Sequence, residues 1–145
     1  MEENVMSLEE NKAIERHIIS EMNKGNFAII DKLFADGFIY HGPFGTELKG
    51  NKSLKRFAAD SVAAFPDFHM TIEAMIAEDD KVATRLTIKG THKGEFAGIP
   101  PTGKKVVVAA ILIAQFENGK EVESWDCWDT ASLLQQLGAI PPPAE

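Results

Sequence analysis

The chain has 145 residues, of which 44% are hydrophobic, and it carries a formal net charge of −7 at pH 7. We expect a single domain over residues 1–145, with its core at about residues 7–140 and frayed ends. The negative charge and the scattered basic residues argue against nucleic acid or an anionic membrane as a partner, and the chain contains no apolar run long enough to span a bilayer. We therefore expect a cytoplasmic protein that binds a neutral or weakly polar small molecule.

The cysteine and the histidines exclude two kinds of stabilising chemistry. The single cysteine, Cys127, cannot form an intrachain disulfide and is compatible with a reducing compartment. The four histidines are scattered, without the spacing of metal ligands. We expect no metal site.

The first half of the chain is predicted to be mainly helical. Apolar residues at intervals of three and four predict a helix that starts at Ser7 and stops at Gly25. A second, short helix is expected to end near Gly37. It precedes a short strand and a Gly-Pro turn over residues 38–45, and a third helix over residues 51–65.

The second half shows the alternation typical of strands, followed by one short helix over residues 130–137. The strand between Val106 and Ala114 is apolar on both faces, so we expect helices to cover one face and a pocket or a partner subunit to cover the other. Helices segregated from an antiparallel sheet define an α+β domain. The predicted strands span residues 67–78, 81–91, 104–117 and 121–128.

Two stretches resemble a known family: GTHKGEFAGIPPTGKKV (residues 90–106) and FENGKEVESWDCWDTASLLQQLG (residues 116–138). They are similar to the SnoaL-like polyketide cyclase or ester cyclase family, of the nuclear transport factor two-like superfamily. The resemblance covers nearly the whole chain. It implies an α+β cone, with three N-terminal helices packed in a strongly curved, mostly antiparallel sheet and a short C-terminal helix.

The same resemblance implies a function. It suggests cofactor-independent aldol or isomerase-type chemistry on an apolar or aromatic small molecule, with one aspartate as general acid and base. It also implies a homodimer formed through the open face of the sheet. One fold carries many functions, so each of these implications is an expectation about the site.

Asp129 matches the catalytic aspartate of the family, seven residues before Gln136 of the Gln-Leu-Gly motif. Burial in an apolar pocket would raise the pKa of such a carboxylate into the range useful for proton transfer. Strand alternation places Asp126 on the opposite face from Asp129. The alternative is that Asp129 caps the helix over residues 130–137.

Five further residues are predicted to line the pocket or contact the substrate: His41, His92, Gln115, Trp125 and Cys127. His41 could instead be a turn residue, and His92 could instead support the loop that follows it. Trp125 is expected to form a wall of the pocket, whereas Trp128 is expected in the core. Gln115 and Cys127 stand where characterised cyclases carry histidine or other polar residues, which weakens the expectation of further proton shuttling.

Three functions remain open at this stage. The first is a cyclase or isomerase that uses Asp129, and the second is a non-catalytic binding protein with the same pocket. The third is an epoxide-hydrolase-like enzyme that activates water through Asp129 and Arg85, although Arg85 shares a face with Lys89 and so also fits a solvated surface. The loop over residues 95–104 is expected to cover the pocket mouth or to contact a partner subunit.

Overall fold

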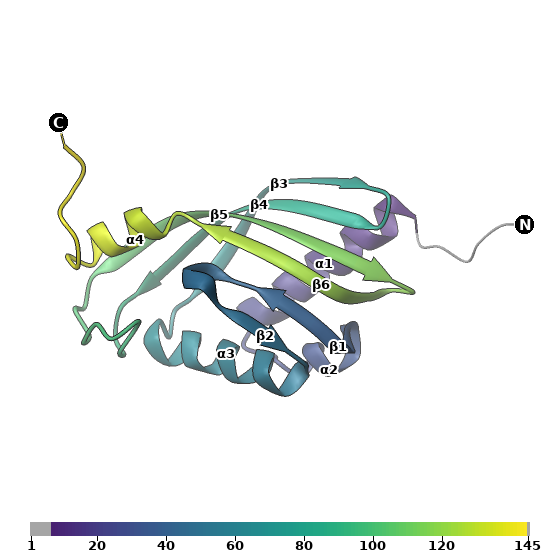
Figure 1. Cartoon of the computed structure of the whole chain (residues 1–145), viewed down its shortest axis with the longest axis horizontal. Coiled ribbons are helices and arrows are strands. Elements are labelled where there is room, and N and C mark those ends of the chain that lie inside the picture. The colour runs from purple at the N-terminus through teal and green to yellow at the C-terminus, as the bar shows by residue number, and fades with distance from the viewer. Residues whose placement is uncertain (1–6, 145) are drawn as a thin grey trace, which may run out of the picture.

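The computed structural model describes residues 7–144, which form one curved sheet with helices on its concave side (Figure 1). The strands are β1 (Phe34–His41), β2 (Glu47–Lys49), β3 (His69–Glu78), β4 (Lys81–Thr91), β5 (Lys105–Glu117) and β6 (Lys120–Trp128). Their order across the sheet is β2-β1-β6-β5-β4-β3. The pair β1–β6 is parallel and the other neighbours are antiparallel.

Four α-helices accompany the sheet in the described part of the chain: α1 (Leu8–Asn23), α2 (Ile29–Leu33), α3 (Asn51–Ala64) and α4 (Thr130–Gln136). Helix α1 packs against β3 and β4, α3 packs against β1 and β2, and α4 packs on β5 at the far end of the sheet. This arrangement confirms the predicted α+β cone. Within residues 7–144, no helix combines the length and the apolar character that crossing a membrane requires.

Helix α1 begins where the sequence predicts, because Ser7 and Glu10 form a capping box. The Ser7 hydroxyl accepts a hydrogen bond from the Glu10 backbone N–H at 3.1 Å, and the Glu10 carboxylate accepts one from the Ser7 N–H at 3.2 Å. The buried face of the helix contains Ile18 and Ile19, but also Glu15. Asn11 is buried on the same helix, so α1 carries an amide and an acid into the interior beside its isoleucines.

The structure corrects the second predicted helix and adds a strand. Helix α2 ends at Leu33, and Phe34 already belongs to β1, where it pairs with Glu121 and is 5% exposed. Burial and strand pairing of Phe34 therefore override its helical spacing. Strand β2 has only three residues and follows a 3-10 turn, η1 (Pro43–Gly45), so it is too short to produce an alternating pattern.

Strand β5 shows why its sequence is apolar on both faces. On the concave side its residues are buried, among them Val106, Val108 and Ala114. On the convex side Val107 and Ile111 are 53% and 51% exposed. The concave face forms the core, and the convex face presents apolar side chains outside it.

A β-bulge in β6 changes which residues face the core. Phe116 of β5 pairs with Glu121, whereas Gln115 pairs with Glu123, so Val122 is the extra residue. Before the bulge Glu121 faces inward, and after it Ser124, Asp126 and Trp128 do so. Two acids that simple alternation would place on opposite faces therefore point into the same interior.

Candidate functional site

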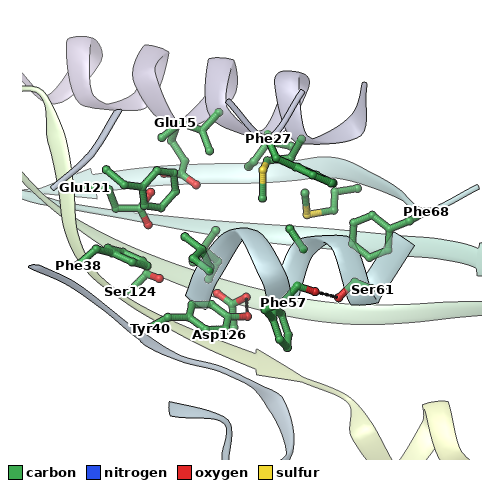
Figure 2. Close-up of a pocket in the computed structure, with 18 of the residues that line it drawn as sticks. Glu15, Phe27, Phe38, Tyr40, Phe57, Ser61, Phe68, Glu121, Ser124 and Asp126 are labelled. Atoms are coloured by element: carbon green, nitrogen blue, oxygen red, sulfur yellow. Dashed lines mark hydrogen bonds between the residues drawn. The ribbon is translucent and has the colours of Figure 1, made fainter. Parts of the chain in front are cut away.

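A cavity of about 110 Å³ lies between α1, α3 and the concave face of the sheet. Most of its wall is apolar, formed by aromatic and aliphatic side chains such as Phe27, Phe38, Phe57 and Phe68 (Figure 2). Apolar walls with a few polar groups are typical of small-molecule sites. The polar side chains in the wall are Glu15, Tyr40, Ser61, Glu121, Ser124 and Asp126.

Asp126 and Tyr40 form the best-defined polar pair in the cavity. The Tyr40 hydroxyl donates a hydrogen bond to Asp126 Oδ2 at 2.7 Å, while the buried Oδ1 accepts no hydrogen bond from the described residues. Burial raises the pKa of Asp126 to about 6, although Tyr40 and Trp128 act in the lowering direction. Burial, together with the Asp126 charge, raises the pKa of Tyr40, so Tyr40 stays protonated and acts as a donor.

Glu15 and Glu121 add two further carboxyl groups, which are 1% and 2% exposed. Burial, followed by the charge of Asp126, raises the pKa of Glu15 to about 8. Burial and the neighbouring Glu15 and Asp126 raise the pKa of Glu121 well above its usual range, against a smaller lowering effect of Ser124. Near neutral pH Asp126 is therefore largely ionised and Glu15 largely protonated, and the equilibrium of Glu121 is shifted toward its protonated form. Environments that separate pKa values in this way assign base and acid roles.

The structure places Asp129 outside this cavity. Asp129 is exposed and is the N-cap of α4, where its carboxylate accepts a hydrogen bond from the Ser132 N–H at 3.1 Å. The helix cap, the alternative left open by the sequence, is thus the arrangement found. The prediction that Asp126 and Asp129 point in opposite directions agrees with this placement. The prediction that Asp129 is the one in the pocket is corrected, because Asp126 is the acid that lines the cavity.

Trp125 and His41, both expected to line the pocket, lie instead on the outer face of the sheet. Their rings stack with centroids 5.5 Å apart. His41 Nδ1 lies 3.0 Å from a carboxylate oxygen of Glu47, and Nε2 lies 2.7 Å from one of Glu123. The contact with Glu123 has the larger effect and the contact with Glu47 the next largest, and both raise the pKa of His41. His41 therefore joins three strands outside the cavity.

The remaining outer-face candidates are also separate from the cavity. Cys127 is exposed, and the Gln115 amide donates to Asp80 at 3.0 Å near the β3–β4 turn. Arg85, considered for water activation, is exposed on β4 opposite Ile111. Trp128, expected in the core, is the tryptophan that lines the cavity.

His92 is fully buried and supports the loop that follows β4. Its Nδ1 accepts a hydrogen bond from the Thr102 N–H at 3.2 Å, and its ring stacks on Phe65 with centroids 5.4 Å apart. Phe96 of this loop packs against Phe65 and Phe44. Phe96 also lines a second cavity of about 20 Å³, whose wall shares Trp128 with the first. His92 thus supports the loop, as the second of its two expected roles stated, and does not line the main cavity.

Two of the acids in the cavity, Glu15 and Glu121, went unnoticed in the sequence, although a signal was present for Glu15. Glu15 lies three, four and seven residues before Ile18, Ile19 and Met22, so it occupies a position of the predicted apolar helix face. An acid at such a position is unusual unless it has a function. Glu121 offers no comparable signal, because the bulge at Val122 is invisible in the pattern.

Comparison with known proteins supports a single family. The sequence profile of the SnoaL-like polyketide cyclase family matches residues 12–137. None of the curated proteins compared with the chain matches it.

Solved structures with the same fold include AclR from Streptomyces galilaeus, for which a hydroxylase activity is suggested. It is 29% identical, with a TM-score of 0.84 over 96% of this chain and 87% of its own. IdmH from Streptomyces antibioticus, a candidate polyketide cyclase, is 27% identical, with a TM-score of 0.78 over 88% and 98% of the two chains. A candidate polyketide cyclase from Bacillus cereus is 30% identical, with a TM-score of 0.75 over 90% and 82%. These relatives thus carry more than one suggested chemistry.

Proposed function

Because the chain belongs to the SnoaL-like polyketide cyclase family, we propose that it catalyses cofactor-independent proton transfer on an apolar carbonyl compound, of aldol or isomerase type. Asp126 is the general base and acid in this proposal. The observation that carries it is the Asp126–Tyr40 pair inside a largely apolar cavity. A base with a pKa of about 6 is largely ionised at neutral pH and still basic enough to take a proton.

The reaction follows from the protonation states of the four polar groups. The Asp126 carboxylate removes a proton from a carbon next to a carbonyl, and the C–H electron pair forms the enolate. The protonated Glu15 or Glu121 can donate a hydrogen bond to the enolate oxygen, as a neutral buried acid does. In an aldol closure the enolate carbon attacks a second carbonyl, and Asp126 returns its proton to the new alkoxide. No group is consumed.

The test is C–H exchange in deuterium oxide with cyclopentanone as the probe, because it is an enolisable apolar ketone with a ring small enough for a cavity of about 110 Å³. We expect the wild-type protein to accelerate exchange above the buffer rate, and Asp126→Asn to lose that acceleration while retaining its circular dichroism spectrum. Asp129→Asn is the matched control, because it changes an acid outside the cavity, and it should retain exchange. Equal exchange in Asp126→Asn and wild type would contradict the proposal. Binding of cyclopentanone without any exchange would favour the non-catalytic binding function.

We also propose that the protein forms a homodimer through the convex face of the sheet. The support is the row of exposed apolar side chains on β5, in which Val107, Ile111 and Ile113 are 53%, 51% and 38% exposed. Adjacent large apolar residues on a central strand favour burial against another surface. A second copy of the chain would present the same row in an isologous contact.

A further inference from the structure

The two oxygens of the Asp126 carboxylate have different surroundings. Oδ2 accepts the hydrogen bond from the Tyr40 hydroxyl at 2.7 Å, and Figure 2 shows the two side chains beside each other, next to Phe57 of α3. Oδ1 is buried and accepts no hydrogen bond from residues 7–144. The lone pairs of Oδ1 are therefore the ones free to take a proton from a ligand in the cavity.

Tyr40 can hold Oδ2 only while its own ring is fixed. The ring packs against Phe57, with centroids 5.4 Å apart, and against Phe38 of the same strand at 6.5 Å. A third neighbour is Gly42, two residues further along the chain. A Cβ atom at position 42 would overlap Tyr40 Cε2 and would lie 2.9 Å from Cζ and 3.0 Å from the hydroxyl oxygen. The Tyr40 ring thus occupies the space that any other residue at position 42 would need.

Gly42 is required here for space and not for backbone conformation. Its φ of −112° and ψ of −173° are an extended conformation that other residues adopt freely. Its backbone has little freedom to move, because the Gly42 N–H donates to the Thr46 carbonyl at 2.8 Å and the buried Pro43 follows. A side chain added at position 42 must therefore displace the Tyr40 ring, and with it the hydroxyl that reaches Asp126.

We propose that Gly42 is a positioning residue for Asp126: it leaves room for the Tyr40 ring, which keeps Oδ2 engaged and leaves Oδ1 to take and return the proton. The inference deepens the proposed function, because it rests on Asp126 as the base and specifies how that base is held. It also gives the Gly-Pro turn after β1 a role at the site, beyond that of ending a strand.

The hydrogen bond from Tyr40 also stabilises the ionised form of Asp126. It lowers the pKa of Asp126, against the larger raising effect of burial. The other acids that line the cavity are Glu15 on α1 and Glu121 on β6, whereas the lining residues from α3, β3 and β5 have no titratable side chain. Both glutamates stay in place when residue 40 or 42 is changed. A shift in the Asp126 pKa of such a variant therefore measures the loss of the hydrogen bond.

The experiment follows the carboxyl carbon of Asp126 by NMR as a function of pH, with the signal assigned by its loss in Asp126→Asn. The pKa of Asp126 in the wild-type protein is about 6. We expect Tyr40→Phe, which keeps the ring, and Gly42→Ala each to raise it by about one unit, because a hydrogen bond to a charged group is lost. Gly37→Ala is the matched control, since Gly37 is an exposed residue of β1 where an added Cβ meets nothing within 4 Å. It should leave the pKa unchanged.

The exchange of cyclopentanone tests the consequence for the reaction. The acidic limb of its pH profile should move upward in Tyr40→Phe and Gly42→Ala, so that exchange at pH 6 falls several-fold, while Gly37→Ala keeps the wild-type profile. The double variant of residues 40 and 42 should have the Asp126 pKa of Tyr40→Phe alone, because Gly42 acts through the hydroxyl. If Gly42→Ala does not fold, the same substitution should cost no stability in Tyr40→Leu, which lacks the ring.

The outcomes separate this inference from the proposed catalysis. An unchanged Asp126 pKa in Tyr40→Phe or in folded Gly42→Ala would overturn the inference, even if exchange of cyclopentanone depends on Asp126. A further rise in the double variant, or a cost of Gly42→Ala that persists in Tyr40→Leu, would also overturn it. Raised pKa values in both single variants, with no exchange by the wild-type protein, would refute only the proposed catalysis.

Discussion

Replacing Glu15 with glutamine should alter how the stability of the protein depends on pH. Burial raises the pKa of Glu15 from 4.5 to about 8, and the side chain is 1% exposed. Between pH 4.5 and about 8, the folded protein therefore holds a proton on Glu15 that the unfolded chain has already released. Stability from this group is fully present below pH 4.5 and is lost as the pH rises through about 8.

The magnitude follows from the same two pKa values. At 1.36 kcal/mol per pH unit, the interval from 4.5 to about 8 corresponds to roughly 5 kcal/mol of stability lost between acidic and alkaline solution. Between about pH 5.5 and 7.5, one proton held only by the folded state gives a slope near −1.4 kcal/mol per pH unit. Glutamine has nearly the same shape and does not titrate. Glu15→Gln should therefore make the slope shallower by about 1.4 kcal/mol per pH unit, the contribution of one proton.

Urea unfolding followed by tryptophan fluorescence at pH 5.5, 6.5, 7.5 and 8.5 would measure the slope. The wild-type protein should lose stability steadily over this range, and Glu15→Gln should lose less at each step. Glu121 also holds a proton in the folded state, so a smaller slope should remain in the variant. Glu78→Gln, at an exposed position, should keep the wild-type slope. A Glu15→Gln slope equal to that of the wild type would refute the account of Glu15 as a buried neutral acid.

Three other changes test separate parts of the structure. Asp129→Ala removes the N-cap of α4 and should lower the free energy of unfolding by about 1 kcal/mol in urea titration while leaving cyclopentanone exchange intact; loss of exchange would return Asp129 to the site. Ile111→Lys places a charge on the exposed row of β5 and should shift sedimentation from dimer to monomer, whereas a monomeric wild type would exclude the dimer. His41 has a raised pKa, so its stabilisation is present below its unfolded pKa and is lost as the pH rises through the folded value. The stability advantage of wild type over His41→Gln should thus shrink from pH 6 to pH 9, and a constant difference would contradict the ion pairs with Glu47 and Glu123.

Local patterns were sufficient for most of the fold. The capping box at Ser7 acts within a few residues, and α1 begins where expected. The short turns between β3 and β4 and between β5 and β6 are equally local, and these strands also appear where expected. The profile match over residues 12–137 confirms the family that the two quoted stretches resemble. These features were predictable because their causes lie in neighbouring residues.

Prediction failed where pairing between distant segments decided the result. Strand β2 exists because it pairs with β1, and α2 is short because Phe34 pairs with β6. The prediction of which face of β6 points inward was also wrong. The resemblance selected Asp129 as the pocket acid, and strand alternation then placed Trp125 and Cys127 on the same, supposedly inward, face. The pattern distinguishes the two faces of a strand, but it does not say which one meets the helices.

The sequence by itself determined the α+β class, the family, and the separation of Asp126 from Asp129 onto opposite faces. Only the tertiary structure brought Glu15 from α1 together with Glu121 and Asp126 from β6 in one cavity. The physical reason is that a single extra residue, Val122, reverses the alternation between Glu121 and Asp126 of β6. The protonation of these acids depends on burial between elements that are far apart in the chain, and the local pattern indicates that burial only for Glu15, through its place on the apolar face of α1.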